Sequence, residues 1–243
     1  MNMRYLSGFL FIILAFPVYG TTPAVSEIID QARAVVGTEE ALKGLVTLRI
    51  EGRIIPNDDT MPDAKIVIIA RKPLSQRLEV KMGDVIETTI LRGKRGCMIR
   101  SNLQMEASKM RMLTPPEMEH VTVSTRQFFS FYKPDYKNGE QVTHEGIELL
   151  QGMRCHKLVY AYPSGTKTTR YFSLEDHSLV ATISNAGVVS VPLGRQRIEG
   201  IRYPESIEFY ENNVKLHTIA IDVIRVNKPL EAGLFAIPKS KEK

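Results

Sequence analysis

The sequence predicts a mainly β fold with some α structure, built as one large curved antiparallel sheet covered by short helices. Three observations predict it. Runs with a two-residue hydrophobic period recur along most of the chain. Tight turns rich in glycine, serine or asparagine join successive runs. Helical periodicity occurs only before the first run and in the middle of the chain. With 243 residues, of which 43% are hydrophobic and 24% charged, the chain is long enough to bury a substantial core.

The first twenty residues have the pattern of a secretory signal peptide. A short basic start, Met1–Arg4, precedes an apolar run, Tyr5–Phe16, and small or tolerated residues then offer a cleavage site near Gly20. The apolar run is shorter than the roughly 20 residues that a membrane-spanning helix needs, so a retained anchor is the weaker alternative. We therefore expect a signal peptide over residues 1–20, a single domain over residues 21–243, and a periplasmic location.

Two short helices are expected next. Apolar residues recur at three- and four-residue spacing over Ala24–Val36, and Gly37 is placed to end that helix. A second turn of helix, Thr38–Lys43, opens with acidic residues that suit a helix N-terminus and is closed by Gly44.

The hydrophobic period then changes from helical to two. Leu48 and Ile50 alternate with Arg49 and Glu51, which indicates a half-buried strand with one wet face. Gly83 supplies the positive φ that a two-residue hairpin turn requires. The expected strands of this first series are Val46–Ile54, Lys65–Ala70, Gln76–Met82, Val85–Leu91 and Cys97–Arg100.

A different stretch, Leu103–Tyr132, separates this series from a second one. Pro115 and Pro116 suit a helix start, and the segment is rich in methionine and phenylalanine. Unbranched, polarizable methionine side chains adapt to ligands of irregular shape. The helix therefore either packs on the concave face of the sheet or also lines a cavity beneath it, and the two roles are compatible.

The second series brings the expected total to eleven or twelve antiparallel strands. Its turns contain Ser164-Gly165 and Asn212-Asn213. The expected strands are Gln141–Leu150, Met153–Tyr162, Lys167–Phe172, Leu179–Ser184, Val188–Arg197, Ser206–Glu211 and Val214–Val226.

No motif of a known enzyme class is present in the sequence. The five histidines have none of the spacings of a metal site, and there is no nucleophile elbow, phosphate-binding loop or dinucleotide-binding glycine motif. The formal net charge of +5 is mild and dispersed, which argues against nucleic-acid binding. We expect a protein that is not an enzyme and that uses no cofactor or metal; a hydrolase whose site assembles only in three dimensions is the weaker reading.

Cys97 and Cys155 are the only cysteines. In an oxidising compartment they can form one disulfide, which would constrain the unfolded chain. The alternative is two buried, inert thiols, and the sequence does not decide between them.

Three segments resemble the LolA/LolB-like family of periplasmic lipoprotein carriers. Gln31–Leu42 running into Val46–Gly52 resembles the start of that fold, and Tyr171–Val180 is similar to its strand, acidic turn and strand. Val226–Leu230 with Leu234–Pro238 is similar to its closing motif. The order of an export signal, helices, strands, a central helical insertion and further strands is also similar. The resemblance implies an unclosed half-barrel with helices over an apolar concave face, which in that family holds acyl chains.

The expected function is therefore a non-catalytic, exported binding protein, monomeric, that carries a lipid, an acyl chain or a lipoprotein. A membrane-bound donor or acceptor protein is an expected partner. The alternative is a periplasmic sensor or adaptor of the same fold that binds a protein partner. Burial of each methylene contributes about 0.8 kcal/mol, so an apolar cavity suits such a cargo. The residues expected to line the cavity are Val46, Leu48, Ile50, Ile66, Ile68, Val80, Met98, Met105, Met112, Met118, Phe128 and Phe129.

Overall fold

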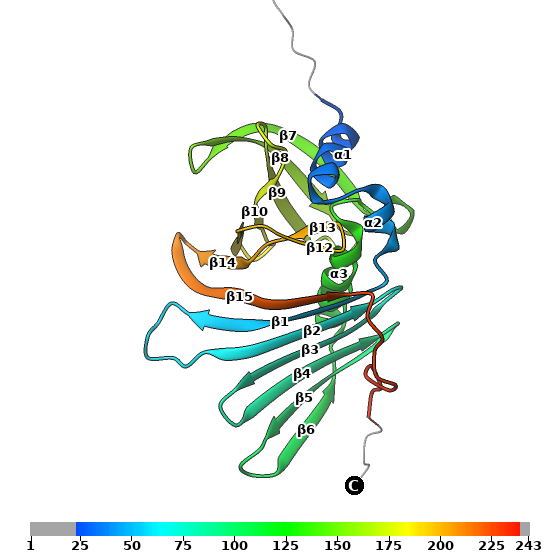
Figure 1. Ribbon diagram of the computed structural model, residues 1–243, viewed down its shortest axis with the longest axis vertical. Coiled ribbons are helices and arrows are strands. Elements are labelled where there is room, and N and C mark those ends of the chain that lie inside the picture. Colours follow the sequence, from blue (N-terminus) through cyan, green and yellow to red (C-terminus); the bar gives the residue numbers. More distant parts are fainter. Residues whose placement is uncertain (1–22, 239–243) are drawn as a thin grey trace, which may run out of the picture.

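A computed structural model describes residues 23–238, so the expected signal peptide lies outside the described residues. Figure 1 shows a strongly curved sheet that wraps around one helix, with two further helices beside it. Within residues 23–238, none of the helices has the length and hydropathy needed to span a membrane.

Three α-helices, one short 3-10 helix and fifteen strands make up this part of the chain. In chain order they are α1 (Val25–Val36), α2 (Glu39–Gly44), β1 (Thr47–Pro56), β2 (Ala64–Arg71), β3 (Ser75–Met82), β4 (Val85–Arg92), β5 (Arg95–Asn102), β6 (Ala107–Met112), α3 (Pro115–Ser130), η1 (Tyr136–Asn138), β7 (Gln141–Leu150), β8 (Met153–Ala161), β9 (Lys167–Ser173), β10 (Leu179–Ile183), β11 (Val189–Leu193), β12 (Gln196–Ile198), β13 (Ile201–Tyr203), β14 (Ser206–Glu211) and β15 (Val214–Val226).

Thirteen of the strands form one antiparallel sheet in the order β6-β5-β4-β3-β2-β1-β15-β14-β11-β10-β9-β8-β7. The long strand β15 joins the two halves because it pairs with β1 on one side and with β14 on the other. In the described part of the chain, β6 and β7 are the two edges and do not pair with each other, so the sheet stays open. The expectation of a large, curved, unclosed antiparallel sheet is confirmed.

Two strand predictions were wrong in detail. Strand β6 was missed because this edge strand is almost wholly exposed and therefore has no alternating apolar pattern. The single strand expected over Val188–Arg197 is divided: β11 ends before Gly194, whose φ of +68° turns the chain into the separate β12–β13 hairpin.

The helices cover one face of the sheet, which we call the inner face. The apolar side chains of α1, Ile28 and Ile29, pack with Leu158 of β8 and Phe172 of β9. Leu42 of α2 packs against strands β1 and β15. The two helices expected near the N-terminus are confirmed: α1 contributes an apolar stripe to the core, and α2 contributes Leu42.

Arg33 of α1 connects all three helices. Its Nη1 donates hydrogen bonds to the carbonyl oxygens of Ser130 and Phe131 at 2.5 and 2.9 Å, at the C-terminal end of α3. Its Nε donates to Glu39 Oε1 of α2 at 2.7 Å. A cation at a helix C-terminus is favoured by the helix dipole and satisfies carbonyl groups that lack intrahelical partners. The buried guanidinium therefore holds the end of α3 in place.

The start and middle of α3 are attached to strands β3 and β5. Thr114 and Glu117 form a capping box at its N-terminus. A Cβ atom on Gly96 of β5 would lie 2.7 Å from Met118 Sδ, so the glycine lets this flexible side chain lie directly against the strand. In the middle of the helix, the buried Thr125 Oγ1 donates to Gln76 Oε1 of β3 at 2.8 Å.

The two cysteines lie on opposite halves of the sheet. Cys97 on β5 packs with Ile69 and Phe235, whereas Cys155 on β8 packs with Tyr171 in a different cluster. Both are free thiols, and burial raises the pKa of each. The disulfide that the cysteine count allowed is therefore not formed, because the strand order places the two residues near opposite edges of the sheet. The alternative of two buried thiols is the arrangement found.

Candidate functional site

Two cavities lie beside α3 on the inner side of the sheet. Cavity A has a volume of about 580 Å³ and lies between α3, the β2–β3 turn and strands β8 and β9. Cavity B has a volume of about 630 Å³ and lies between α3 and strands β9, β10, β11 and β14. Both volumes fall in the range of roughly 300–1,000 Å³ that is typical of small-molecule sites.

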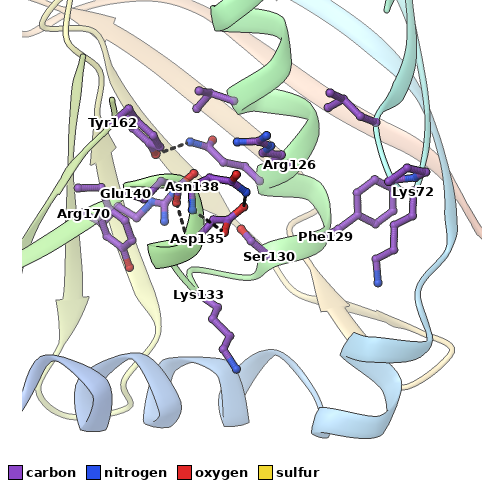
Figure 2. Close-up of a pocket in the computed structure, with 15 residues that line it drawn as sticks. Lys72, Arg126, Phe129, Ser130, Lys133, Asp135, Asn138, Glu140, Tyr162 and Arg170 are labelled. Atoms are coloured by element: carbon purple, nitrogen blue, oxygen red, sulfur yellow. Dashed lines mark hydrogen bonds between the residues drawn. The ribbon is translucent and has the colours of Figure 1, made fainter. Parts of the chain in front are cut away.

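Cavity A combines apolar and aromatic side chains with several charges (Figure 2). The residues that line it are Lys72, Pro73, Leu74, Val123, Arg126, Gln127, Phe129, Ser130, Lys133, Asp135, Asn138, Glu140, Tyr160, Tyr162 and Arg170.

Cavity B is lined mainly by hydroxyl, amide and apolar groups and by no lysine or arginine. The residues that line it are Pro116, Glu119, His120, Val123, Ser124, Gln127, Tyr162, Thr166, Thr168, Thr182, Ser184, Asn185, Ala186, Val188, Ser190 and Phe209.

Three residues belong to the walls of both cavities: Val123, Gln127 and Tyr162. Gln127 Nε2 donates a hydrogen bond to Tyr162 Oη at 2.9 Å, which Figure 2 shows as a link from α3 to the end of β8. These side chains are therefore the boundary between two adjoining spaces.

Arg170 of β9 is the most deeply buried cation of cavity A, with only 5% of its surface exposed. Its guanidinium carbon lies 4.1 Å from the ring centre of Tyr160 and 5.7 Å from that of Tyr132. A cation over an aromatic face is stabilised by the ring quadrupole. Burial raises the pKa of Tyr132 to about 12 and also raises that of Tyr160, so both phenols remain neutral beside the arginine.

The histidine pair of the described chain lies away from both cavities, and the described residues form no metal site. Within residues 23–238 there is no group of three His, Cys, Asp or Glu side chains placed to hold a metal ion. The structure brings together His144 and His156, with Nε2 and Nδ1 3.3 Å apart, but neither residue lines cavity A or B. Burial lowers the pKa of His156, which favours its neutral form.

The predicted lining residues fall in several places. Phe129 lines cavity A. Phe128 and Phe129 pack from α3 onto the cluster formed by α2, β1 and β15. Met118 packs over Gly96. Six others share the inner face of strands β1–β5, as the strand register shows: Leu48, Ile50, Ile66, Ile68, Val80 and Met98.

The remaining three lie outside the interior. Val46 precedes β1 and is about half exposed, and Met105 lies in the β5–β6 turn with 74% of its surface exposed. Met112 is paired with Cys97 and therefore faces the outer side of the sheet. Methionine content alone does not distinguish these positions from inward-facing ones.

Sequence reasoning missed most of the residues that line the cavities. The period of two places Tyr160 and Tyr162 on the same face as Leu158, so a signal for these two was present. Arg170 has no such signal because its burial depends on Tyr132 and Tyr160, which come from distant parts of the chain.

Several solved structures share this fold. A DUF1329 family protein from Desulfovibrio piger has a TM-score of 0.58 and 11% identity, over 88% of this chain and 98% of that one. A LolA superfamily protein from Nitrosomonas europaea has a TM-score of 0.56 and 9% identity, over 89% and 99%. A putative outer membrane lipoprotein-sorting protein domain from Vibrio parahaemolyticus has a TM-score of 0.54 and 10% identity, over 86% and 95%.

No protein-family model matches the sequence, and no curated protein matches it. The likeness to solved structures is therefore one of fold. It extends over most of the chain and confirms the fold that the sequence resemblance implied. This chain has a LolA-like fold, an open antiparallel half-barrel with helices over its inner face.

Proposed function

We propose that this protein is an exported, non-catalytic carrier that shelters an acyl chain of a lipid or lipoprotein beside α3. The observation that carries the proposal is the pair of adjoining cavities, about 580 and 630 Å³, on the inner side of the sheet. Each methylene moved from water into such a space contributes about 0.8 kcal/mol, so a long tail binds without many directional contacts.

The surroundings of the cavities support binding rather than chemistry. Tyr132 and Tyr160 are held neutral by burial, and the polar groups of cavity B are mostly serine and threonine hydroxyls. The basic start and apolar run at the N-terminus support export to the periplasm. In this proposal the protein acts as a monomer and exchanges its cargo with a membrane-bound donor or acceptor.

Native mass spectrometry of protein purified without detergent tests the proposal. We expect a bound lipid mass, and uptake of a fluorescent fatty acid once that lipid is removed. Ala186→Trp places a large ring at an exposed position on the wall of cavity B, and it should reduce uptake without unfolding the protein. Val214→Trp, on the exposed start of β15, is the matched control and should leave uptake unchanged. Protein with no lipid mass and no uptake contradicts the proposal.

A second candidate function is that of an adaptor for a protein partner. It is favoured by the exposed apolar side chains at the β7–β8 tip, Ile147, Leu149 and Met153, of which Leu149 is 72% exposed. Exposed apolar groups on a sheet edge are typical of protein interaction sites. A Leu149→Ser variant that binds lipid normally but loses a partner in a pull-down from the periplasm would favour this function.

A further inference from the structure

The wall of cavity A contains more cations than carboxylates, and its cations form no ion pairs with described residues. Four cations line the cavity, Lys72, Arg126, Lys133 and Arg170, against two carboxylates. Among residues 23–238, no carboxylate oxygen lies within 4 Å of any of these four cations. The cations therefore leave an uncompensated positive charge at the cavity wall.

The two carboxylates of the wall are engaged in a turn. Glu140 Oε2 accepts a hydrogen bond from the backbone N–H of Asp135 at 2.8 Å. Asp135 in turn accepts from the backbone N–H and the side-chain amide of Asn138. These bonds hold the connection between α3 and β7, and with four cations against two carboxylates the wall keeps an excess of two positive charges.

Arg170 is the strongest indication of what the positive charge serves. An arginine residue that is 95% removed from solvent normally has a carboxylate partner, because an unpaired buried charge is costly. Here the aromatic faces of Tyr160 and Tyr132 provide the contacts. Neither neutral ring carries the negative charge that would balance the arginine. The guanidinium fork matches carboxylate and phosphate oxygens in a bidentate geometry.

Lys72 lies at the opposite end of the same cavity from Arg170, and Lys133 lies between them on the connection that follows α3 (Figure 2). Lys72 Nζ donates to the carbonyl oxygen of Lys43 at 3.1 Å and lies 5.6 Å from the ring centre of Phe129, so both of its contacts are uncharged. Cavity B, by contrast, has no lysine or arginine in its wall. Its wall does carry the carboxylate of Glu119, so the anionic end of an amphiphile is favoured in cavity A rather than in cavity B.

We propose that cavity A binds the anionic head group of an acyl ligand, a carboxylate or a phosphate, with Arg170 in direct contact and Lys72 and Lys133 adding to the attraction. This inference rests on the proposed function and names the ligand class. The tail then extends along Val123 toward cavity B.

Two probes with the same tail test the head-group preference. cis-Parinaric acid carries a carboxylate, and its methyl ester does not; both report binding through the fluorescence of the tail. Charged hydrogen bonds should make the acid bind about tenfold or more tightly than the ester. Arg170→Gln should bring the two affinities together without weakening the ester, whereas Arg170→Lys should retain part of the preference. Arg202→Gln, at the exposed central position of β13, is the control.

A preference for the acid that persists undiminished in folded Arg170→Gln overturns the inference. If that variant does not fold by circular dichroism, the double variant Lys72→Gln/Lys133→Gln takes its place, and an unchanged preference there overturns it equally. Equal binding of acid and ester by the native protein defeats this inference alone. Binding of neither probe defeats the proposed function.

Competition separates the two sources of the anion. Palmitate and lysophosphatidic acid are each compared with a neutral ligand of the same tail, hexadecanol and monoacylglycerol, for displacement of the ester probe. Stronger displacement by palmitate identifies a carboxylate, and stronger displacement by lysophosphatidic acid identifies a phosphate. If neither competes better than its neutral counterpart, the inference is overturned.

Discussion

The two sides of α3 differ in how they meet the sheet. Toward β3 and β5, Met118 lies against Gly96, and Thr125 is hydrogen-bonded to Gln76 with both side chains buried. Toward β8–β11, the helix borders two cavities, and its one hydrogen bond to this half in the described chain, from Gln127 to Tyr162, lies at their common wall. We call these the packed side and the cavity side.

The difference separates stability from binding. Side chains on the packed side exclude water and fix the position of the helix, so their loss should cost folding free energy. Side chains on the cavity side have empty space beside them, so their loss should change what fits there. A carrier needs both, because a cavity persists only if another part of the core holds its walls apart.

Truncation of the core should show the largest effect. Leu48→Ala removes a side chain that is 1% exposed and should lower the free energy of unfolding by about 3 kcal/mol, with a range of about 2–5. Val188→Ala, in the wall of cavity B, should cost less than about 1 kcal/mol and change fatty-acid uptake instead. Urea denaturation measures both. Equal losses of stability would contradict the division of α3 into two sides.

A matched pair of hydrogen-bond variants should show an intermediate effect. Thr125→Val keeps the shape of the side chain but removes a buried hydroxyl that lies 2.8 Å from Gln76 Oε1 and 2.6 Å from the Val121 carbonyl oxygen, at a cost of about 1–3 kcal/mol. Gln127→Met removes the bond to Tyr162 beside a cavity that water can enter, so it should cost no more than about 0.5 kcal/mol. If Gln127→Met destabilises the protein more than Thr125→Val, the boundary residue is part of the core.

Acid should first destabilise the half of the sheet that faces the cavity side of α3. Strands β1–β6 contain no histidine, whereas burial lowers the pKa of His156 on β8 and of His217, which stacks on Phe209 of cavity B. The folded state therefore disfavours their protonation, so the stability they contribute is complete above about pH 6.5 and is lost as the pH falls below it.

Hydrogen exchange measures where this loss occurs. Between pH 7.5 and 5.5, corrected exchange should rise on β8 and β14 more than on β2–β4. His156→Gln should reduce the rise on β8, while His120→Gln, at an exposed position of α3 in the wall of cavity B, should not. A uniform change along the sheet would assign the acid sensitivity to the whole fold.

The sequence predicted the sheet better than the site, and the reason is physical. In segments such as Leu48–Ile50, apolar and polar residues alternate because one face of the strand is buried. This pattern is local, so it can be recognised from the sequence alone. The cavities depend instead on where a helix stands above that face, and this is set by Gly96, Thr125 and Arg33, residues whose partners are distant in sequence. The apolar strand residues on β1–β5 were identified correctly as inward-facing. However, α3 packs against that half of the sheet, and the cavities lie between α3 and the other half.

Photo-crosslinking tests the central claim most directly, because it reports where a bound tail lies. A palmitate analogue with a diazirine near its methyl end would be loaded into the protein, irradiated, and its adducts mapped by peptide mass spectrometry. Our account predicts adducts on α3 and on strands β9–β11, around Val123, Tyr162 and Val188. Adducts confined to β1–β5, or to the exposed β7–β8 tip, would contradict it.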